Sequence, residues 1–129
     1  MIITGKYPKL RMRRSRKEDW SRRLIRENTL SGSDFVLPIF LTDGKNKKIA
    51  IKSMNGVYRY SIDNISKIID KALKNKVPMI ALFPHTNTKL KNVNGSEAFN
   101  ENNLVSKAIV AIKKKYKNKI GIMCDVALD

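Results

Sequence analysis

Two aspartates near the end of the sequence have the setting in which a carboxylate can do chemistry. Asp125 stands inside the apolar run Ile120–Leu128, and Asp129 follows that run directly. Burying a carboxylate costs several kcal/mol unless a cation, a metal ion or hydrogen-bond donors compensate. Two interpretations of Asp125 are open: a residue of an active site, or a structural residue held by hydrogen bonds. For Asp129 the position favours a solvated loop residue over a site residue.

The other candidates for catalysis lack the partners that their chemistry needs. His85 is the only histidine, with no serine or cysteine nucleophile motif beside it, and we expect an ordinary loop residue. Cys124 is the only cysteine, which excludes an intrachain disulfide and a cysteine cluster for zinc. It precedes Asp125 and therefore faces the opposite side of a strand, so we expect a buried, inert thiol against the helices. No GxxxxGK or GxGxxG pattern indicates nucleotide binding.

Three apolar runs predict the strands that would position these residues. They cover Phe35–Leu41, Val77–Phe83 and Ile120–Leu128, and their continuity is typical of strands buried on both faces of a parallel sheet. A shorter strand is expected at Ile49–Ile51. In a parallel α/β fold, ligands bind beyond the carboxyl ends of the strands, which here means the loops after Phe40 and Phe83 and the aspartates that end the third run.

Helical periodicity fills the two intervals between the long strands. Ser61–Lys76 has one apolar face, with Ser61 as its expected N-cap. A second helix is expected from a cap at Asn100 to about Lys117. The order strand, helix, strand, helix, strand predicts right-handed crossovers and a parallel sheet. Because the sequence ends on a strand with no helix to cover it, we expect a truncated domain.

The first 33 residues differ from the rest in pattern. Residues 1–17 are polar and basic without an apolar period, so they predict an arm that needs a neighbouring surface to become ordered. A short amphipathic helix is expected over Asp19–Asn28, before a break at Ser31–Asp34. We therefore divide the chain into residues 1–33, an arm with a short helix, and residues 34–129, an α/β part.

Composition bounds the class of protein. The chain has 129 residues and a net charge of +16, with most of its basic residues being lysines scattered along the sequence. Nucleic-acid binding needs basic groups gathered on one face, so it is kept only as an alternative. No run of about 18 apolar residues predicts a membrane span, and no apolar segment near Met1 predicts a secretory signal. A cytoplasmic protein is the simplest interpretation.

A series of motifs from Tyr7 onward resembles one known family. They are Tyr7-Pro8 with Arg11, Arg13-Arg14 and Arg16; Asp34–Phe40; Ser53-Met54 with Gly56-Val57; Ala81–Phe83; Gly95–Ala98; and Asp125–Asp129. In this order and spacing they resemble the landmarks of porphobilinogen synthases, also called 5-aminolevulinic acid dehydratases. One departure is Asn55, where many members have proline.

The resemblance implies a fold and an assembly. Members of the family have an N-terminal arm that wraps a neighbouring subunit of a homo-oligomer, commonly an octamer, followed by a TIM (β/α)8 barrel. Residues 34–129 would then be the first part of the barrel, with its first three strands, and the chain would be truncated. Tyr7, Arg11, Arg13 and Arg14 would be arm residues that contact another subunit.

The resemblance also implies a reaction. The family is a lyase that condenses two molecules of 5-aminolevulinate to porphobilinogen, an early step of haem and other tetrapyrrole biosynthesis. Asp125 matches an active-site aspartate and Phe83 an aromatic residue of the substrate pocket. The two lysines that form Schiff bases with the substrate lie on later strands, beyond residue 129, so the 129-residue chain alone is predicted to be inactive.

Metal use follows from two positions in the last motif. Zinc-dependent members have cysteines where this chain has Ala127 and Asp129. Because carboxylate suits hard ions such as magnesium and thiolate suits zinc, we expect magnesium, with Asp129 as a candidate ligand, and do not expect zinc. Two rival functions stay open: a non-catalytic remnant that serves as an interaction fragment, and a basic nucleic-acid-binding domain.

Overall fold

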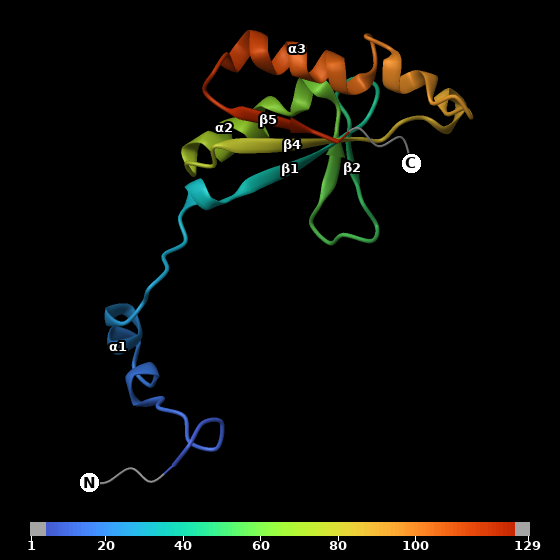
Figure 1. Ribbon diagram of the computed structural model, residues 1–129. Coiled ribbons are helices and arrows are strands. Elements are labelled where there is room, and N and C mark those ends of the chain that lie inside the picture. Colours follow the sequence, from blue (N-terminus) through green and yellow to red (C-terminus); the bar gives the residue numbers. More distant parts are fainter. Residues whose placement is uncertain (1–4, 126–129) are drawn as a thin grey trace. The chain divides into compact units, whose positions relative to one another are not determined.

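A computed structural model describes residues 5–125, which form two compact units that divide between Leu30 and Ser31 (Figure 1). The first unit contains a 3-10 helix, Arg14–Arg16, and the short helix α1, Asp19–Leu24. α1 ends four residues before the predicted Asn28. Its apolar residues find little to pack on within this unit, with Trp20 64 % and Leu24 79 % exposed. A helix this short without a buried face gains little from extension.

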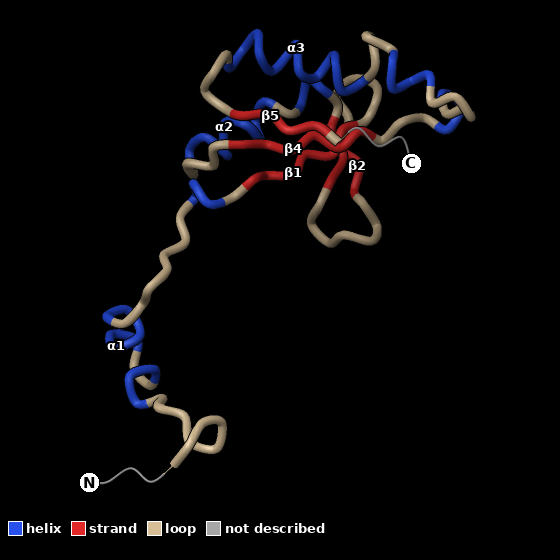
Figure 2. The backbone as a smooth tube through the Cα atoms, in the orientation of Figure 1, coloured by secondary structure: helices blue, strands red, loops and turns tan. Residues whose placement is uncertain are grey.

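The second unit is built on a five-stranded sheet in the order β2-β3-β1-β4-β5 (Figure 2). The strands are β1 (Val36–Leu41), β2 (Lys48–Ala50), β3 (Tyr58–Tyr60), β4 (Met79–Pro84) and β5 (Gly121–Cys124). β3, β1, β4 and β5 pair in parallel, and only β2 is antiparallel to its neighbour. The three long predicted strands are present, as is the short strand near Ile49, whereas β3 was not predicted. Residues 126–128 of the third predicted strand lie outside the described residues.

Two helices pack on this sheet, α2 (Ser66–Lys74) and α3 (Leu104–Tyr116). The predicted cap at Ser61 is wrong. Its side chain makes no cap hydrogen bond, because its Oγ accepts the Lys47 backbone N–H at 2.9 Å and is buried there. A 3-10 turn, Ile62–Asn64, then separates Ser61 from the first residue of α2.

The predicted cap at Asn100 is also wrong by three residues. Asn103 Oδ1 accepts the Ser106 N–H at 2.8 Å and caps α3. Asn100 instead caps a turn, in which its Oδ1 accepts the Asn102 N–H at 3.0 Å. The apolar face predicted for this helix is correct, since Ala108, Ile112 and Tyr116 are buried.

The core lies on one face of the sheet. Ile39 and Leu41 of β1 and Ile80 and Leu82 of β4 form one cluster with buried residues of α2 and α3, and Cys124 packs at its margin. Burial along β1 alternates, with Val36 and Pro38 exposed, so within the described residues this strand is covered on one face only. Figure 1 shows α2 and α3 on the same side of the sheet. No helix among the described residues is long and apolar enough to span a membrane.

Candidate functional site

A pocket of about 300 Å³ lies at the carboxyl ends of β1, β4 and β5. It is lined by Asp43 from the loop after β1, Thr86 from the loop after β4, and Asp125, which follows β5. The N-terminal end of α3 closes it with Asn103 and neighbouring residues. The three loops that the sequence marked as separate candidates therefore border one cavity, the usual location of ligands in parallel α/β folds.

Continuation of the strand ladder past the strand ends positions these loops. The His85 N–H donates to the Leu41 carbonyl at 3.0 Å, and the Asp125 N–H donates to the Leu82 carbonyl at 3.2 Å. Asp125 is exposed rather than buried within a strand, because β5 ends at Cys124. The burial cost that singled out this aspartate therefore does not apply to it. Asp129 lies outside the described residues.

The long loop between β4 and α3 is organised by its asparagines. Asn87 Oδ1 accepts the Lys89 N–H at 3.0 Å and Asn92 Oδ1 accepts the Ser96 N–H at 3.1 Å, each closing a turn. Asn100 Nδ2 donates to Glu97 Oε2 at 3.1 Å, which holds the Glu97 carboxylate at the pocket. Short polar side chains that bond to nearby backbone are what let such a loop keep one conformation without a core of its own.

The pocket lining is mixed in charge. Asp43, Glu97 and Asp125 supply carboxylates, and Lys107 supplies a cation. Cys124 also borders the pocket, and burial raises the pKa of its thiol, which fits the expected inert residue. Within residues 5–125 no group of three or more His, Cys, Asp or Glu side chains could hold a metal ion. The described part of the chain therefore supplies no complete metal site.

Phe83, the predicted pocket residue, lies on the sheet face opposite the helical core. Leu82 and Pro84 are its neighbours along β4, and its partner on the adjacent strand β1 is Phe40. The two rings stack with centroids 5.5 Å apart and planes inclined by 30°. Phe83 does not line the 300 Å³ pocket. His85 is exposed and does not line it either.

Sequence reasoning missed Asp43 and Glu97 as pocket residues and Phe40 as the partner of Phe83. Asp43 could have been found from its place two residues after the end of the first apolar run. Glu97 sits inside the Gly95–Ala98 motif that carried part of the resemblance. The Phe40 contact had no sequence signal, because it depends on the register of two strands whose paired residues, such as Phe40 and Phe83, are 43 positions apart in the sequence.

The arm residues Tyr7, Arg11 and Arg13 line a shallow groove of their own unit. The Arg11 guanidinium lies 5.7 Å from the centroid of the Tyr7 ring, within the range of a cation–π contact. Arg14 begins the 3-10 helix. The subunit contact expected of these residues stays a prediction.

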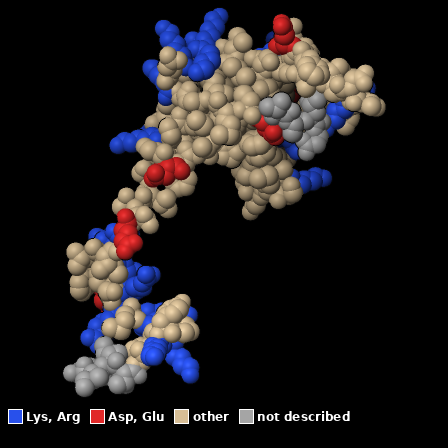
Figure 3. All heavy atoms as spheres, in the orientation of Figure 1, with Lys and Arg blue, Asp and Glu red and all other residues tan. Residues whose placement is uncertain are grey.

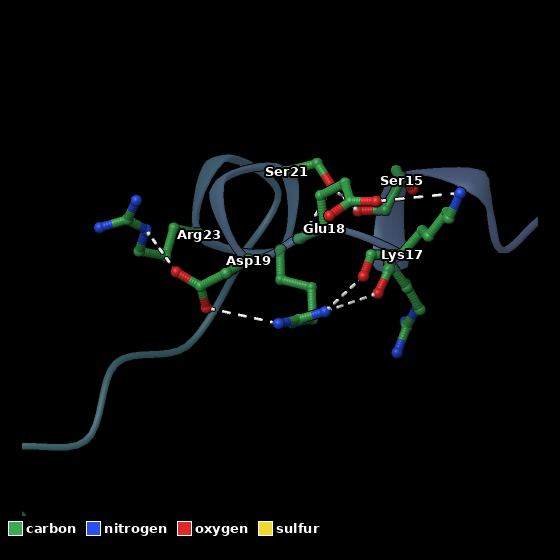
Figure 4. A network of polar contacts seen from close by, with 8 residues as sticks. Ser15, Lys17, Glu18, Asp19, Ser21 and Arg23 are labelled. Atoms are coloured by element: carbon green, nitrogen blue, oxygen red, sulfur yellow. Dashed lines mark hydrogen bonds and ion pairs between the residues drawn. The ribbon is translucent and has the colours of Figure 1, made fainter.

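A network of polar contacts fixes the fold of the arm around α1 (Figure 4). Ser21 Oγ donates to the Ser15 carbonyl, and Asp19 pairs with Arg23 at 3.1 Å. Arg22 also reaches Asp19, at 3.4 Å, and donates to the carbonyls of Arg16 and Lys17. These arginines therefore have partners within the arm.

The basic side chains of the second unit are dispersed on the side that Figure 3 shows. In Figure 3 its Lys and Arg side chains form several separate groups on the visible side. At the end of α3, Lys115 pairs with Asp70 at 3.7 Å. The visible side therefore lacks the continuous basic surface that a nucleic-acid backbone needs.

Comparison with known proteins defines the class of protein first. A crystal structure of delta-aminolevulinic acid dehydratase (porphobilinogen synthase) from Toxoplasma gondii, in complex with the reaction product porphobilinogen, superposes with a TM-score of 0.81 at 32 % identity. The match covers 92 % of this chain and 33 % of that one. The predicted fold class is thereby confirmed: an arm and the first three core strands of a TIM barrel enzyme.

The family follows from sequence. The family model described as delta-aminolevulinic acid dehydratase matches residues 9–129, and the chain belongs to this family. It is 50 % identical over 120 residues to the delta-aminolevulinic acid dehydratase of Bradyrhizobium diazoefficiens and 36 % identical over 118 residues to that of Ruminiclostridium josui. These matches cover 93 % and 92 % of this chain, but 34 % and 56 % of the relatives. The chain thus spans about a third to just over half of their length.

Proposed function

We propose that this chain supplies the arm and the first three barrel strands of a porphobilinogen synthase, which condenses two molecules of 5-aminolevulinate to porphobilinogen in tetrapyrrole biosynthesis. The observation that carries the proposal is the match of 92 % of the chain to a relative crystallised with porphobilinogen. The position of Asp125 at the carboxyl end of β5 supports its role as an active-site carboxylate. Phe83 supplies an apolar wall on the face that a closed barrel turns inward.

None of the lysines of this chain has the setting that Schiff-base chemistry needs. Every one of them is exposed. A lysine attacks a ketone only as the free amine, and enzymes favour the free amine by desolvation or by a neighbouring cation in a closed site. The residues that form the covalent intermediate therefore have to come from the remaining strands of the barrel.

A porphobilinogen assay tests whether the Schiff-base lysines come from the later barrel strands rather than from this chain. A polypeptide restricted to these 129 residues, given 5-aminolevulinate and magnesium, is expected to form no product. A chain extended through the later barrel strands is expected to form it. Product from the short polypeptide would mean that one of its own lysines forms the Schiff base. No product from the extended chain would favour a non-catalytic remnant.

Magnesium, a homo-octamer and a cytoplasmic location complete the proposal. Magnesium is proposed because position 129 carries a carboxylate rather than the thiolate that suits zinc. The exposed aromatic and basic residues of the arm, Tyr7 among them, support a role in subunit contact, since an arm without core contacts gains order from a neighbour. Activity of the extended chain titrated with EDTA and then with magnesium or zinc tests the metal, and light scattering tests the assembly.

A further inference from the structure

Two phenylalanines lie side by side on the sheet face that the core helices leave free. Phe40 of β1 and Phe83 of β4 are direct register partners in the parallel pair, and both are half-buried. Ile39 and Leu41, which flank Phe40, and Leu82, which precedes Phe83, belong to the helical core on the other face. Because side chains alternate between the two faces, the two rings share the free face. Their centroids are 5.5 Å apart with planes inclined by 30°.

The neighbours of this pair across the sheet are polar. Phe40 is paired on its other side with Arg59 of β3. Beyond Phe83, the register continues to Asp125, since Leu82 pairs with Cys124 and the Asp125 N–H bonds to the Leu82 carbonyl. A row of Arg59, Phe40, Phe83 and Asp125 thus crosses four adjacent chain segments near their carboxyl ends. Among the described residues, Phe40 is the only aromatic ring that stacks on Phe83.

We propose that Phe40 is a positioning residue of the synthase reaction: its ring holds the ring of Phe83 in the orientation in which Phe83 forms the apolar wall proposed above for the inward face of the closed barrel. The inference rests on the proposed function. A half-buried phenylalanine can adopt other staggered side-chain rotamers if the space beside it opens. A stacked neighbour of fixed register removes that freedom, because offset-stacked rings attract each other beyond the area that they bury. Phe40 thereby acts on the substrate only through Phe83.

Kinetics of variants in the full-length enzyme test the proposal. Phe40→Leu removes the ring and keeps an apolar side chain. Its KM for 5-aminolevulinate is expected to rise roughly three- to tenfold, the range that the loss of one aromatic pair corresponds to, with a smaller change in kcat. Phe40→Tyr keeps the ring and is expected to retain the KM of the wild type. The matched control is Phe35→Leu, the same substitution just before β1 at an exposed residue without a stacked partner among the described residues.

A double-mutant cycle with Phe83→Leu separates positioning from a general structural role. If Phe40 acts through Phe83, Phe40→Leu is expected to leave KM unchanged once Phe83 has been replaced. An equal rise of KM in both backgrounds would overturn the proposal, as would a Phe40→Leu enzyme with the kinetics of Phe35→Leu. If Phe40→Leu does not fold, Phe40→Met carries the same cycle, because methionine fills a similar volume without a ring. A wild-type enzyme that forms no porphobilinogen would overturn the proposed function and this inference together, whereas an active wild type leaves only the role of Phe40 in question.

Discussion

Asp34 closes a capping box where the second unit begins. Its Oδ2 accepts the Ser31 backbone N–H at 2.7 Å and the Ser31 hydroxyl at 3.0 Å, while Ser31 Oγ accepts the Ser33 N–H. The Ser31 backbone donor, and then its hydroxyl, hold the pKa of the Asp34 carboxyl below its usual 3.8. Because the folded-state pKa is lowered, the stabilisation by this group is present above pH 3.8 and is lost as the pH falls through the folded-state pKa.

We therefore expect Asp34→Asn to lower the thermal unfolding midpoint of the full-length enzyme at pH 7 and to lower it less at pH 3. At the lower pH the wild-type carboxyl is also becoming neutral, so the variant loses less by comparison. Differential scanning calorimetry at pH 7, 5 and 3 measures the difference. Glu101→Gln, a neutralised carboxylate on an exposed turn, is the control. If the difference in unfolding midpoint between Asp34→Asn and the wild type stayed constant across this pH range, the ionised Asp34 carboxylate would not be the source of the stabilisation.

Gly32 sits so close to the end of α2 that it has no room for a side chain. A Cβ built on Gly32 would lie 1.8 Å from the Asn75 backbone oxygen. Backbone at a helix end cannot yield as a flexible side chain can, so we expect Gly32→Ala to destabilise the protein by about 1–3 kcal/mol. Urea unfolding measures this. Ser33→Ala removes only a long hydrogen bond of 3.4 Å to the Lys76 carbonyl and should cost much less. If Gly32→Ala and Ser33→Ala lowered the free energy of unfolding equally, the segment around Gly32 could move away from Asn75 without cost, and the steric argument would be wrong.

At the scale of elements, periodicity located the helices but not their caps. The buried residues Ala108, Ile112 and Tyr116 recur every four positions, and such a repeat persists wherever the helix begins. Asn100, Asn102 and Asn103 are chemically alike, so sequence alone does not distinguish the cap from residues of the preceding turn. β3 was missed for a related reason: three residues are too few to establish a period, and its pairing depends on the distant β1.

The sequence predicted the location of the candidate site, but not which side chains face it or contact one another. The rule that ligands bind beyond the carboxyl ends of parallel strands located the loops that border the pocket. Which face a residue takes depends on register, and register depends on the packed sheet. Cys124 was correctly assigned to the helical face from its alternation with Asp125. The pairing of Phe40 with Phe83, by contrast, needed the alignment of two strands that no local pattern reveals.

The position of the α3 cap gives a prediction at this scale. Asn103→Ala removes the acceptor of the Ser106 N–H, and we expect a loss of about 1 kcal/mol in the free energy of unfolding. Asn100→Ala is a matched control in the same loop, since it disturbs only the turn and the contact with Glu97. We expect a smaller loss for this variant. Urea unfolding of both variants measures the difference, and a larger loss at Asn100 would restore the original prediction.

At the scale of the whole molecule, the described sheet has strand edges and an apolar face that no other described element covers. β5 is an edge strand, and β3 pairs only with the last two residues of β1, so the first part of β1 has one unpaired side among the described residues. β1 is therefore an open edge over only the first part of its length. The face with Phe40, Phe83 and Met123 adds apolar surface next to these edges, and such edges template association with other chains.

A polypeptide restricted to these 129 residues is therefore expected to self-associate, and one charge on the exposed edge should oppose this. Met123 lies on β5 and is 51 % exposed, so Met123→Lys places a cation where a second chain would pair. Size-exclusion chromatography with light scattering should show large species for the wild type and fewer for this variant. Val110→Lys adds the same charge on the 68 % exposed outer side of α3 and controls for net charge. An equal gain from both variants would mean that net charge, rather than the strand edge, governs association. A monodisperse wild-type monomer that unfolds cooperatively would mean that the five-stranded sheet and its two helices suffice for a stable fold, and that the remaining barrel is needed for chemistry alone.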